Sequence, residues 1–306
     1  MSLETLMPVA PISRESVAST PTRLSGFVAL TKPRIAIMVL LTVAVGFILG
    51  ARGASHPKTL ILALVGTGLV AAGASAWNQV LERDRDARMR RTARRPLPAG
   101  LLEPTESAVF ASVLAISGVV ILGFGTNLLA AFVALATFVL YVAVYTPLKP
   151  ITTLNTAVGA IPGALPPVIG WAAATGSVGI EALTLFLIVF LWQFPHFLAI
   201  AWVHRDDYAR GGHKMLPCVD PDGVLTARQA VAHALVLVPA GLLPTVVNVA
   251  GGWYFAGALI AGISYLAAAV WFWSDVNDAS ARRLMGASFF YLPFILLLLL
   301  LNPMPA

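Results

Sequence analysis

The stretch WNQVLERDRD, residues 77–86, ends a long hydrophobic segment and places three oxygen-bearing side chains four residues apart: Asn78, Glu82 and Asp86. On an α-helix of 3.6 residues per turn, positions i, i+4 and i+8 stay on nearly the same face. Carboxylate and amide oxygens are ligands that Mg²⁺ accepts in proteins. The spacing therefore predicts a helical face that binds a divalent metal.

Arginines interleave with this face and follow it, at positions Arg83, Arg85, Arg88, Arg90, Arg91, Arg94 and Arg95. Guanidinium groups bind phosphate oxygens through paired hydrogen bonds, so a metal beside this cluster suits a diphosphate. Arg83, Arg91, Thr92 and Arg95 are candidate substrate contacts, and the last three are candidates to close over the phosphate oxygens. The simpler interpretation is a basic loop whose acids only balance its charge. The shared helical face of the acids argues against that interpretation.

The composition indicates a polytopic membrane protein. Of 306 residues, 58% are hydrophobic and 11% are charged, whereas soluble domains average about 25% charged residues. The single cysteine excludes an intrachain disulfide. Segments of roughly 20 apolar residues span a bilayer, and nine candidates occur, at 34–51, 59–80, 106–124, 127–146, 153–173, 181–203, 226–249, 253–273 and 284–301.

We therefore expect an all-α integral membrane protein with nine transmembrane helices around a central cavity that opens to the cytoplasmic side. Residues 26–306 are expected to form one domain. Residues 1–25 are expected to be a disordered cytoplasmic tail, because they are polar and lack the apolar stretch of a signal peptide.

The positive charges predict the orientation of these helices. Among the lysines and arginines, only Arg52 and Lys58 fall on the second side of the predicted bundle. The positive-inside rule then makes the amino terminus and the basic loops cytoplasmic or matrix-facing. This distribution explains the net charge of +6 without a nucleic-acid partner. The short amino-terminal tail favours a bacterial inner membrane over a mitochondrial one.

A second group of polar residues lies at the end of the sixth segment, in WQFPHFLAIAWVHRDDYARGGHKMLP, residues 192–217. Trp192, Gln193 and His196 fall inside the span, where polar groups usually face a cavity or a partner. His196 has three open interpretations: a haem-iron ligand, a proton carrier, or a hydrogen-bonded contact between helices.

The same segment continues into a loop with further candidates. Asp206 and Asp207 supply a second acidic group opposite the first, and two such groups hold two or three Mg²⁺ ions around a diphosphate. The loop's other candidate substrate contacts are Tyr208, Arg210 and Lys214. We expect His204 and His213 to be solvated loop histidines.

A third group lies in YTPLKPITTLN, residues 145–155, where Tyr145, Lys149 and Asn155 fall near the same membrane surface. The glycines and prolines of residues 159–171 permit close helix packing. They also allow a groove for a flat or long apolar substrate.

These motifs, with LTKPRI at 30–35, resemble the UbiA superfamily of intramembrane prenyltransferases over residues 24–301. The pattern D-x-x-M-x-R-T-x-x-R-P from Asp86 to Pro96, combined with W-Q-x-P-H-F, is similar to the branch that farnesylates protohaem IX. The resemblance implies farnesyl diphosphate and haem B as substrates, haem O as product after addition of water, and Mg²⁺ as cofactor. It also suggests haem A synthase or a terminal oxidase as partner proteins.

The resemblance assigns the metal to the first acidic face together with Asp206 or Asp207, and it adds Lys32 and Arg34 as substrate contacts. Glu82 stands where the family more often has aspartate. The Asp206-Asp207-Tyr208 sequence replaces the D-x-x-x-D of quinone-pathway members. The alternatives are a related prenyltransferase with an aromatic or quinone-precursor acceptor, a transporter, and a non-catalytic haem-binding assembly factor.

Overall fold

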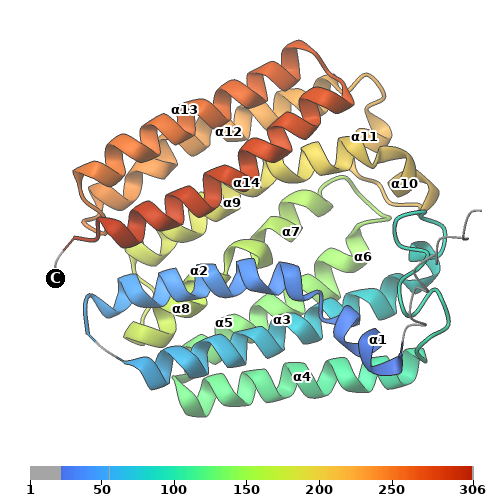
Figure 1. Cartoon of the computed structure of the whole chain (residues 1–306), viewed down its shortest axis with the longest axis horizontal. Coiled ribbons are helices and arrows are strands. Elements are labelled where there is room, and N and C mark those ends of the chain that lie inside the picture. The colour runs from blue at the N-terminus through green and yellow to red at the C-terminus, as the bar shows by residue number, and fades with distance from the viewer. Residues whose placement is uncertain (1–21, 55, 305–306) are drawn as a thin grey trace, which may run out of the picture.

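The computed structural model describes residues 22–54 and 56–304, and these residues form helices joined by loops, without a β-strand (Figure 1). The helices in chain order are α1 (Arg23–Leu30), α2 (Pro33–Ala51), α3 (Pro57–Asp86), α4 (Pro104–Gly125), α5 (Leu128–Val139), the π-helix η1 (Leu140–Tyr145), α6 (Thr146–Leu148), α7 (Asn155–Ala164), α8 (Pro166–Thr175), α9 (Ile180–Val203), α10 (Arg205–Arg210), α11 (Leu216–Val219), α12 (Val224–Val246), α13 (Gly252–Ser274) and α14 (Asp278–Leu301).

Nine segments of the described chain are long and apolar enough to cross a membrane, which confirms the predicted number. α3 extends to Asp86, beyond the predicted end at residue 80, and α14 begins at Asp278 rather than at residue 284. Hydropathy marks the apolar part of a helix, whereas polar residues extend the helix past it. The extension of α3 is what places Glu82 and Asp86 on helical backbone.

The predicted tail, residues 1–25, lies mostly outside the described residues. Its last residues begin α1, where the side chain of Thr22 accepts a hydrogen bond from the backbone of Ser25. Threonine is a favoured residue at a helix N-cap for this reason.

The helices pack in two groups. α2 lies against α3 and α8, and α3 lies against α4, whereas α9 packs against α12 and α14. Figure 1 shows α1, α10 and α11 at the same end of the bundle as the loop between α3 and α4. We call this end the arginine end, because residues 87–103 carry much of the arginine cluster.

α2 and α8 approach closely because each presents a glycine to the other. A Cβ atom on Gly46 would lie 2.1 Å from the carbonyl oxygen of Pro167, and one on Gly170 would lie 2.0 Å from that of Val43. Small residues at helix interfaces allow such approaches in membranes. Pro166 also contributes, because it begins α8 and separates it from α7.

Candidate functional site

The last turns of α3 carry the predicted acidic face. Asn78, Glu82 and Asp86 are only 2%, 4% and 0% exposed. The side chain of Asn78 donates from Nδ2 to Glu82 Oε2 over 2.9 Å, so these two residues meet as their spacing predicts. Asp86 Oδ1 is buried and has no hydrogen-bond partner among the described residues. An enclosed oxygen without a donor is costly unless a cation or water reaches it.

Lys32 reaches the first residue of this face from the break between α1 and α2. Its backbone is left-handed, with φ 49° and ψ 60°, which is uncommon for a residue other than glycine and especially before a proline. Lys32 lies between the end of α1 and the start of α2, and its Nζ donates to Asn78 Oδ1 over 3.0 Å.

The two carboxylates of the face are paired in the same way. Lys149 Nζ lies 2.8 and 3.0 Å from the two oxygens of Glu82, and Arg95 donates to Asp86 Oδ2 over 2.7 Å. Burial lowers the pKa of Lys149, but Tyr145 and Glu82 outweigh this effect, so the pKa lies above its usual value. Lys149 is therefore an ammonium ion at neutral pH. Each of the three residues of the acidic face on α3 thus contacts one cation.

A π-helical segment positions Lys149. At the first residue of α6, directly after η1, the Thr146 hydroxyl donates to the carbonyl oxygen of Tyr141 over 2.8 Å, and it accepts from Asn78 Nδ2 over 3.2 Å. Lys149 Nζ lies 4.7 Å from the ring centroid of Tyr145, within range of a cation–π interaction. π-Helical turns often occur at functional sites. Thr146 was not predicted as a site residue, because nothing in a hydropathy pattern reveals the π-helix that precedes it.

A cavity of about 420 Å³ is lined by Lys32 and Arg95, which contact the acidic face, and its other polar lining residues are Gln79, Arg91 and Arg94. Four cations around one cavity favour an anion of several charges. Gln79 is 1% exposed and donates to the carbonyl oxygen of Leu30, so it ties α1 to α3 beside the cavity.

Asp207 does not pair with this face directly. Its oxygens accept hydrogen bonds from the backbone N–H groups of Arg90 over 3.1 Å and Arg91 over 3.3 Å, and from the guanidinium of Arg210. Burial raises the pKa of Asp207, but the Arg210 guanidinium and the two backbone N–H groups lower it by more. The pKa therefore lies below its usual value. The carboxylate therefore fastens α10 to the arginine-rich loop.

Among the described residues, no three histidine, cysteine, aspartate or glutamate side chains are grouped closely enough to hold a metal ion. Asp206 is exposed. The participation of Asp206 and Asp207 in a metal site thus stays a sequence-based prediction, to which the geometry adds the loop contacts of Asp207.

Other predicted residues brace the same region. The Thr92 hydroxyl donates to the carbonyl oxygen of Asp86 over 2.8 Å, and Asn155 Nδ2 donates to that of Lys214 over 2.9 Å. Arg91 lies over the ring of Tyr208, 5.6 Å from its centroid. These contacts tie the loop after α3 and the loop after α10 to the site.

The prediction that His213 is solvated is wrong. Its side chain is 3% exposed, and burial lowers its pKa to about 4. The turn at Gly212, with φ +71°, directs the chain back into the protein. The adjacent glycines Gly211 and Gly212 were the available signal, since a positive φ favours glycine. His204, by contrast, is half-buried.

Predicted residues on α9 lie deeper in the bundle. Trp192 Nε1 donates to the carbonyl oxygen of Ser288 over 2.9 Å, and Gln193 Nε2 donates to that of Ala160 over 3.2 Å. His196 is buried and contacts Ser288. Three predicted substrate contacts are instead exposed, and among the described residues their side chains form no hydrogen bond or ion pair with the acidic face: Arg34, Arg83 and Lys214.

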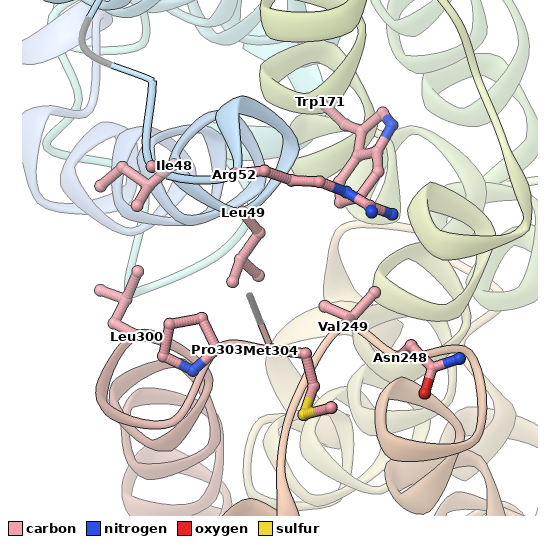
Figure 2. Close-up of a pocket in the computed structure, with 10 residues that line it drawn as sticks. Ile48, Leu49, Arg52, Trp171, Asn248, Val249, Leu300, Pro303 and Met304 are labelled. Carbon is pink, nitrogen blue, oxygen red and sulfur yellow. The ribbon is translucent and has the colours of Figure 1, made fainter. Parts of the chain in front are cut away.

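A second cavity, of about 450 Å³, lies away from the predicted site residues (Figure 2). Its walls are largely apolar and include Leu49, Trp171 and Val249, with Arg52 as the charged lining residue. None of the predicted site residues lines it.

The comparisons with known proteins agree with this arrangement. The family model described as "UbiA prenyltransferase family" matches residues 39–294. The chain belongs to this family. Among curated relatives of this UbiA member, "Protoheme IX farnesyltransferase" of Solibacter usitatus is 44% identical over an alignment of 285 residues that covers 90% of this chain and 98% of the relative.

Solved structures confirm the UbiA fold. A structure described as digeranylgeranylglyceryl phosphate synthase in membranes is similar with a TM-score of 0.77 at 18% identity, covering 92% of this chain and 98% of that one. A UbiA homologue from Archaeoglobus fulgidus, bound to GPP and Mg²⁺, is similar with a TM-score of 0.62 at 14% identity, covering 90% of this chain and 99% of that one.

Proposed function

We propose that this UbiA protein transfers the farnesyl group of farnesyl diphosphate to a vinyl group of protohaem IX and forms haem O. The choice of acceptor is supported by 44% identity along nearly the whole length of a relative with that activity in its name. The observation that carries the donor chemistry is the buried acidic face, each member of which contacts a cation. Transfer to an aromatic or quinone-precursor acceptor is the alternative function, and the test below distinguishes it from transfer to haem.

The residues on α3 fit a divalent metal. Asn78, Glu82 and Asp86 would hold Mg²⁺, since they offer hard oxygen ligands and Asp86 Oδ1 is enclosed without a donor. When bound, the metal would neutralise diphosphate charge and so make the diphosphate a better leaving group. Asp206 and Asp207 remain candidates for a second metal.

The cations that now contact the acidic face would bind the diphosphate oxygens. Lys32, Lys149 and Arg95 converge on this face from three separate segments. Arg91 and Arg94 line the adjoining cavity and add positive charge to it. Positive groups fixed in a partly buried site stabilise the charge that develops on a departing diphosphate.

The reaction balances without a redox partner. The C1–O bond of farnesyl diphosphate breaks, and diphosphate leaves with the electron pair. The vinyl π-electrons form the new bond to C1, which leaves a cation on the carbon beside the porphyrin ring. Water adds to that carbon and loses a proton, which gives a hydroxyethylfarnesyl group. The apolar surroundings of the site would protect the allylic cation from earlier capture by water.

We further propose that residues 26–306 act as one prenyltransferase domain in a bacterial inner membrane. The arginine end would face the cytoplasm, because the positive-inside rule places basic loops there. Farnesyl diphosphate would then enter from the cytoplasm. Docking with haem A synthase or a terminal oxidase remains an expectation from the sequence resemblance.

The test is mass spectrometry of porphyrins extracted after the purified protein has been incubated with haem B, farnesyl diphosphate and Mg²⁺. A hydroxyethylfarnesyl haem should form, and Asp86→Ala should slow its formation at least about a hundredfold, as for other preorganised charge-stabilising groups. Transfer of farnesyl to a quinone precursor offered in parallel, with haem unchanged, would refute the acceptor. Absence of transfer to either acceptor would refute the enzymatic proposal.

A further inference from the structure

His213 is a buried histidine to which the proposed function gives no role. Its side chain is 3% exposed, although it belongs to the polar loop between α10 and α11. Tyr208 meets the imidazole edge-on, at 6.0 Å between ring centroids and 74° between planes. A Cβ atom on Gly211 would lie 2.9 Å from Met89 Sδ and 3.3 Å from His213 Cδ2. The imidazole therefore lies inside the arginine end, next to the loop that follows α3.

Backbone hydrogen bonds fix the position of His213 relative to the acidic face. Its own N–H donates to the carbonyl oxygen of Tyr208 over 2.9 Å, and the N–H of Lys214 donates to that of Lys149 over 2.7 Å. Asn155 Nδ2 donates to the carbonyl oxygen of Lys214 over 2.9 Å. The residue after His213 is thus bonded through both of its backbone groups. One of these bonds ends on the lysine whose ammonium pairs with the acidic face.

The charges of the acidic site act on the imidazole. Burial lowers the pKa of His213 to about 4. Glu82 opposes this effect, whereas Lys149 and two arginines of the cluster add to it. The imidazole is therefore uncharged at neutral pH, and it lies within electrostatic range of both the acidic face and its cations.

The two nitrogens of this ring have different surroundings. Nδ1 is enclosed and has no hydrogen-bond partner among the described residues. Nε2 likewise has no partner there, but it is not fully enclosed, so water or a ligand reaches it. A neutral imidazole carries one N–H group and one lone pair. The hydrogen belongs on Nε2, because an N–H group at the enclosed Nδ1 would have no acceptor.

We propose that His213 is a further substrate contact of this site, and that its Nε2–H group donates a hydrogen bond to a diphosphate oxygen of the prenyl donor. The proposal rests on the proposed function, because that function supplies the diphosphate. A neutral donor binds a phosphate oxygen without repelling a metal ion nearby, which one more lysine or arginine would do. The competing explanation is that His213 only fills the space beside Tyr208 and holds the loop in place.

The test is a calorimetric titration of the purified full-length protein with inorganic diphosphate in the presence of Mg²⁺ and, separately, with farnesol. His213→Asn should weaken the binding of diphosphate at least about tenfold, because it removes a hydrogen bond to a charged group. His213→Gln should stay within a few fold of the wild type, because its longer side chain brings an amide N–H group to about the place of Nε2. Binding of farnesol, which lacks the diphosphate, should hold in both variants.

Hydrogen exchange separates a substrate contact from a packing role. If His213 only holds the loop, both variants should speed up exchange at the backbone amide of Lys214, which bonds to Lys149. The proposal expects unchanged exchange at this amide in both variants. His204→Gln is the matched control, since His204 is a half-buried histidine between α9 and α10, and it should bind diphosphate as the wild type does.

Equal diphosphate affinity in the wild type and in His213→Asn, or equal weakening by the two variants, would overturn the proposal. Farnesyl transfer measured on the same samples separates this inference from the proposed function. Haem O formation with a wild-type KM for farnesyl diphosphate in His213→Asn would leave the proposed function standing without the inference. Weakened diphosphate binding in His213→Asn, with wild-type transfer of farnesyl to a quinone precursor instead of haem, would retain the inference and refute the function.

Discussion

Replacement of Asp207 tests whether its carboxylate orders the arginine-rich loop. Asp207→Ala removes the acceptors of the backbone N–H groups of Arg90 and Arg91, together with the partner of Arg210. Each hydrogen bond to a charged group contributes about 1.5–3 kcal/mol. We take the low end for the two backbone bonds, because they are long at 3.1 and 3.3 Å, and little for Arg210, which is 40% exposed.

The sum is about 3 kcal/mol, which corresponds to roughly a hundredfold shift toward an unfastened loop. Two measurements report this shift. Hydrogen exchange of the backbone amides of residues 88–95 should speed up by about that factor, and kcat/KM for farnesyl diphosphate should fall because Arg91 and Arg95 lose their positions. Asp207→Asn should have a smaller effect, since it retains one acceptor oxygen. Asp84→Asn, at an exposed position on α3, is the control.

The competing explanation is that Asp207 binds a metal ion, as its sequence motif predicts. In that case Asp207→Ala would raise the Mg²⁺ concentration needed for half-maximal activity and leave the amide exchange of residues 88–95 unchanged. That combination would refute the fastening role. Because the pKa of Asp207 lies below its usual value, the carboxylate stays ionised, and the effect should not vary with pH across the neutral range.

Three further predictions follow from the site and the packing. Lys149→Met should reduce kcat/KM for farnesyl diphosphate by at least about a hundredfold, because it removes a fixed charge and leaves Glu82 buried without its cation; retention of activity within a few fold would contradict the role given to Lys149. Gly170→Ala should lower the free energy of unfolding in detergent by about 1–3 kcal/mol, since its Cβ would lie 2.0 Å from the carbonyl oxygen of Val43. Gly68→Ala, whose Cβ would lie 3.5 Å from a leucine side chain, is the matched control, and equal thermal shifts in the two variants would count against the packing argument. Removal of divalent metal with EDTA should abolish farnesyl transfer, and Mg²⁺ should restore it; a rate indifferent to EDTA would exclude the metal role of the acidic face.

Much of the fold could be predicted from the sequence because each span is a run of apolar residues with polar ends. The hydropathy pattern gave the number of spans in the described residues and most of their positions. It could not give the helix ends, since α3 and α14 continue through charged residues. Nor could it reveal the break at Lys32, which depends on a left-handed residue before Pro33.

The acidic face was predictable because helical spacing alone decides which side chains share a face. The partners of that face were not, because Lys32, Lys149 and Arg95 come from distant segments brought together only by packing. The contacts of Asp207 could not be predicted either, because two of its partners are backbone N–H groups, which every residue type except proline has. His213 was mistaken for a solvated residue because its segment is polar, although its turn folds inward.

The pairing of each ligand candidate on α3 with a cation has a thermodynamic consequence. In the described structure the lysines and the arginine contact most of the oxygens that a metal would use, whereas Asp86 Oδ1 has no donor. A metal that took those oxygens would free the cations, and a diphosphate that drew the cations away would free the oxygens. Each ligand thus lowers the free-energy cost of binding the other, and linkage makes this coupling reciprocal. The protein should therefore bind Mg²⁺ weakly alone, bind farnesyl diphosphate weakly alone, and bind the two together tightly, so that the empty site resists stray divalent cations.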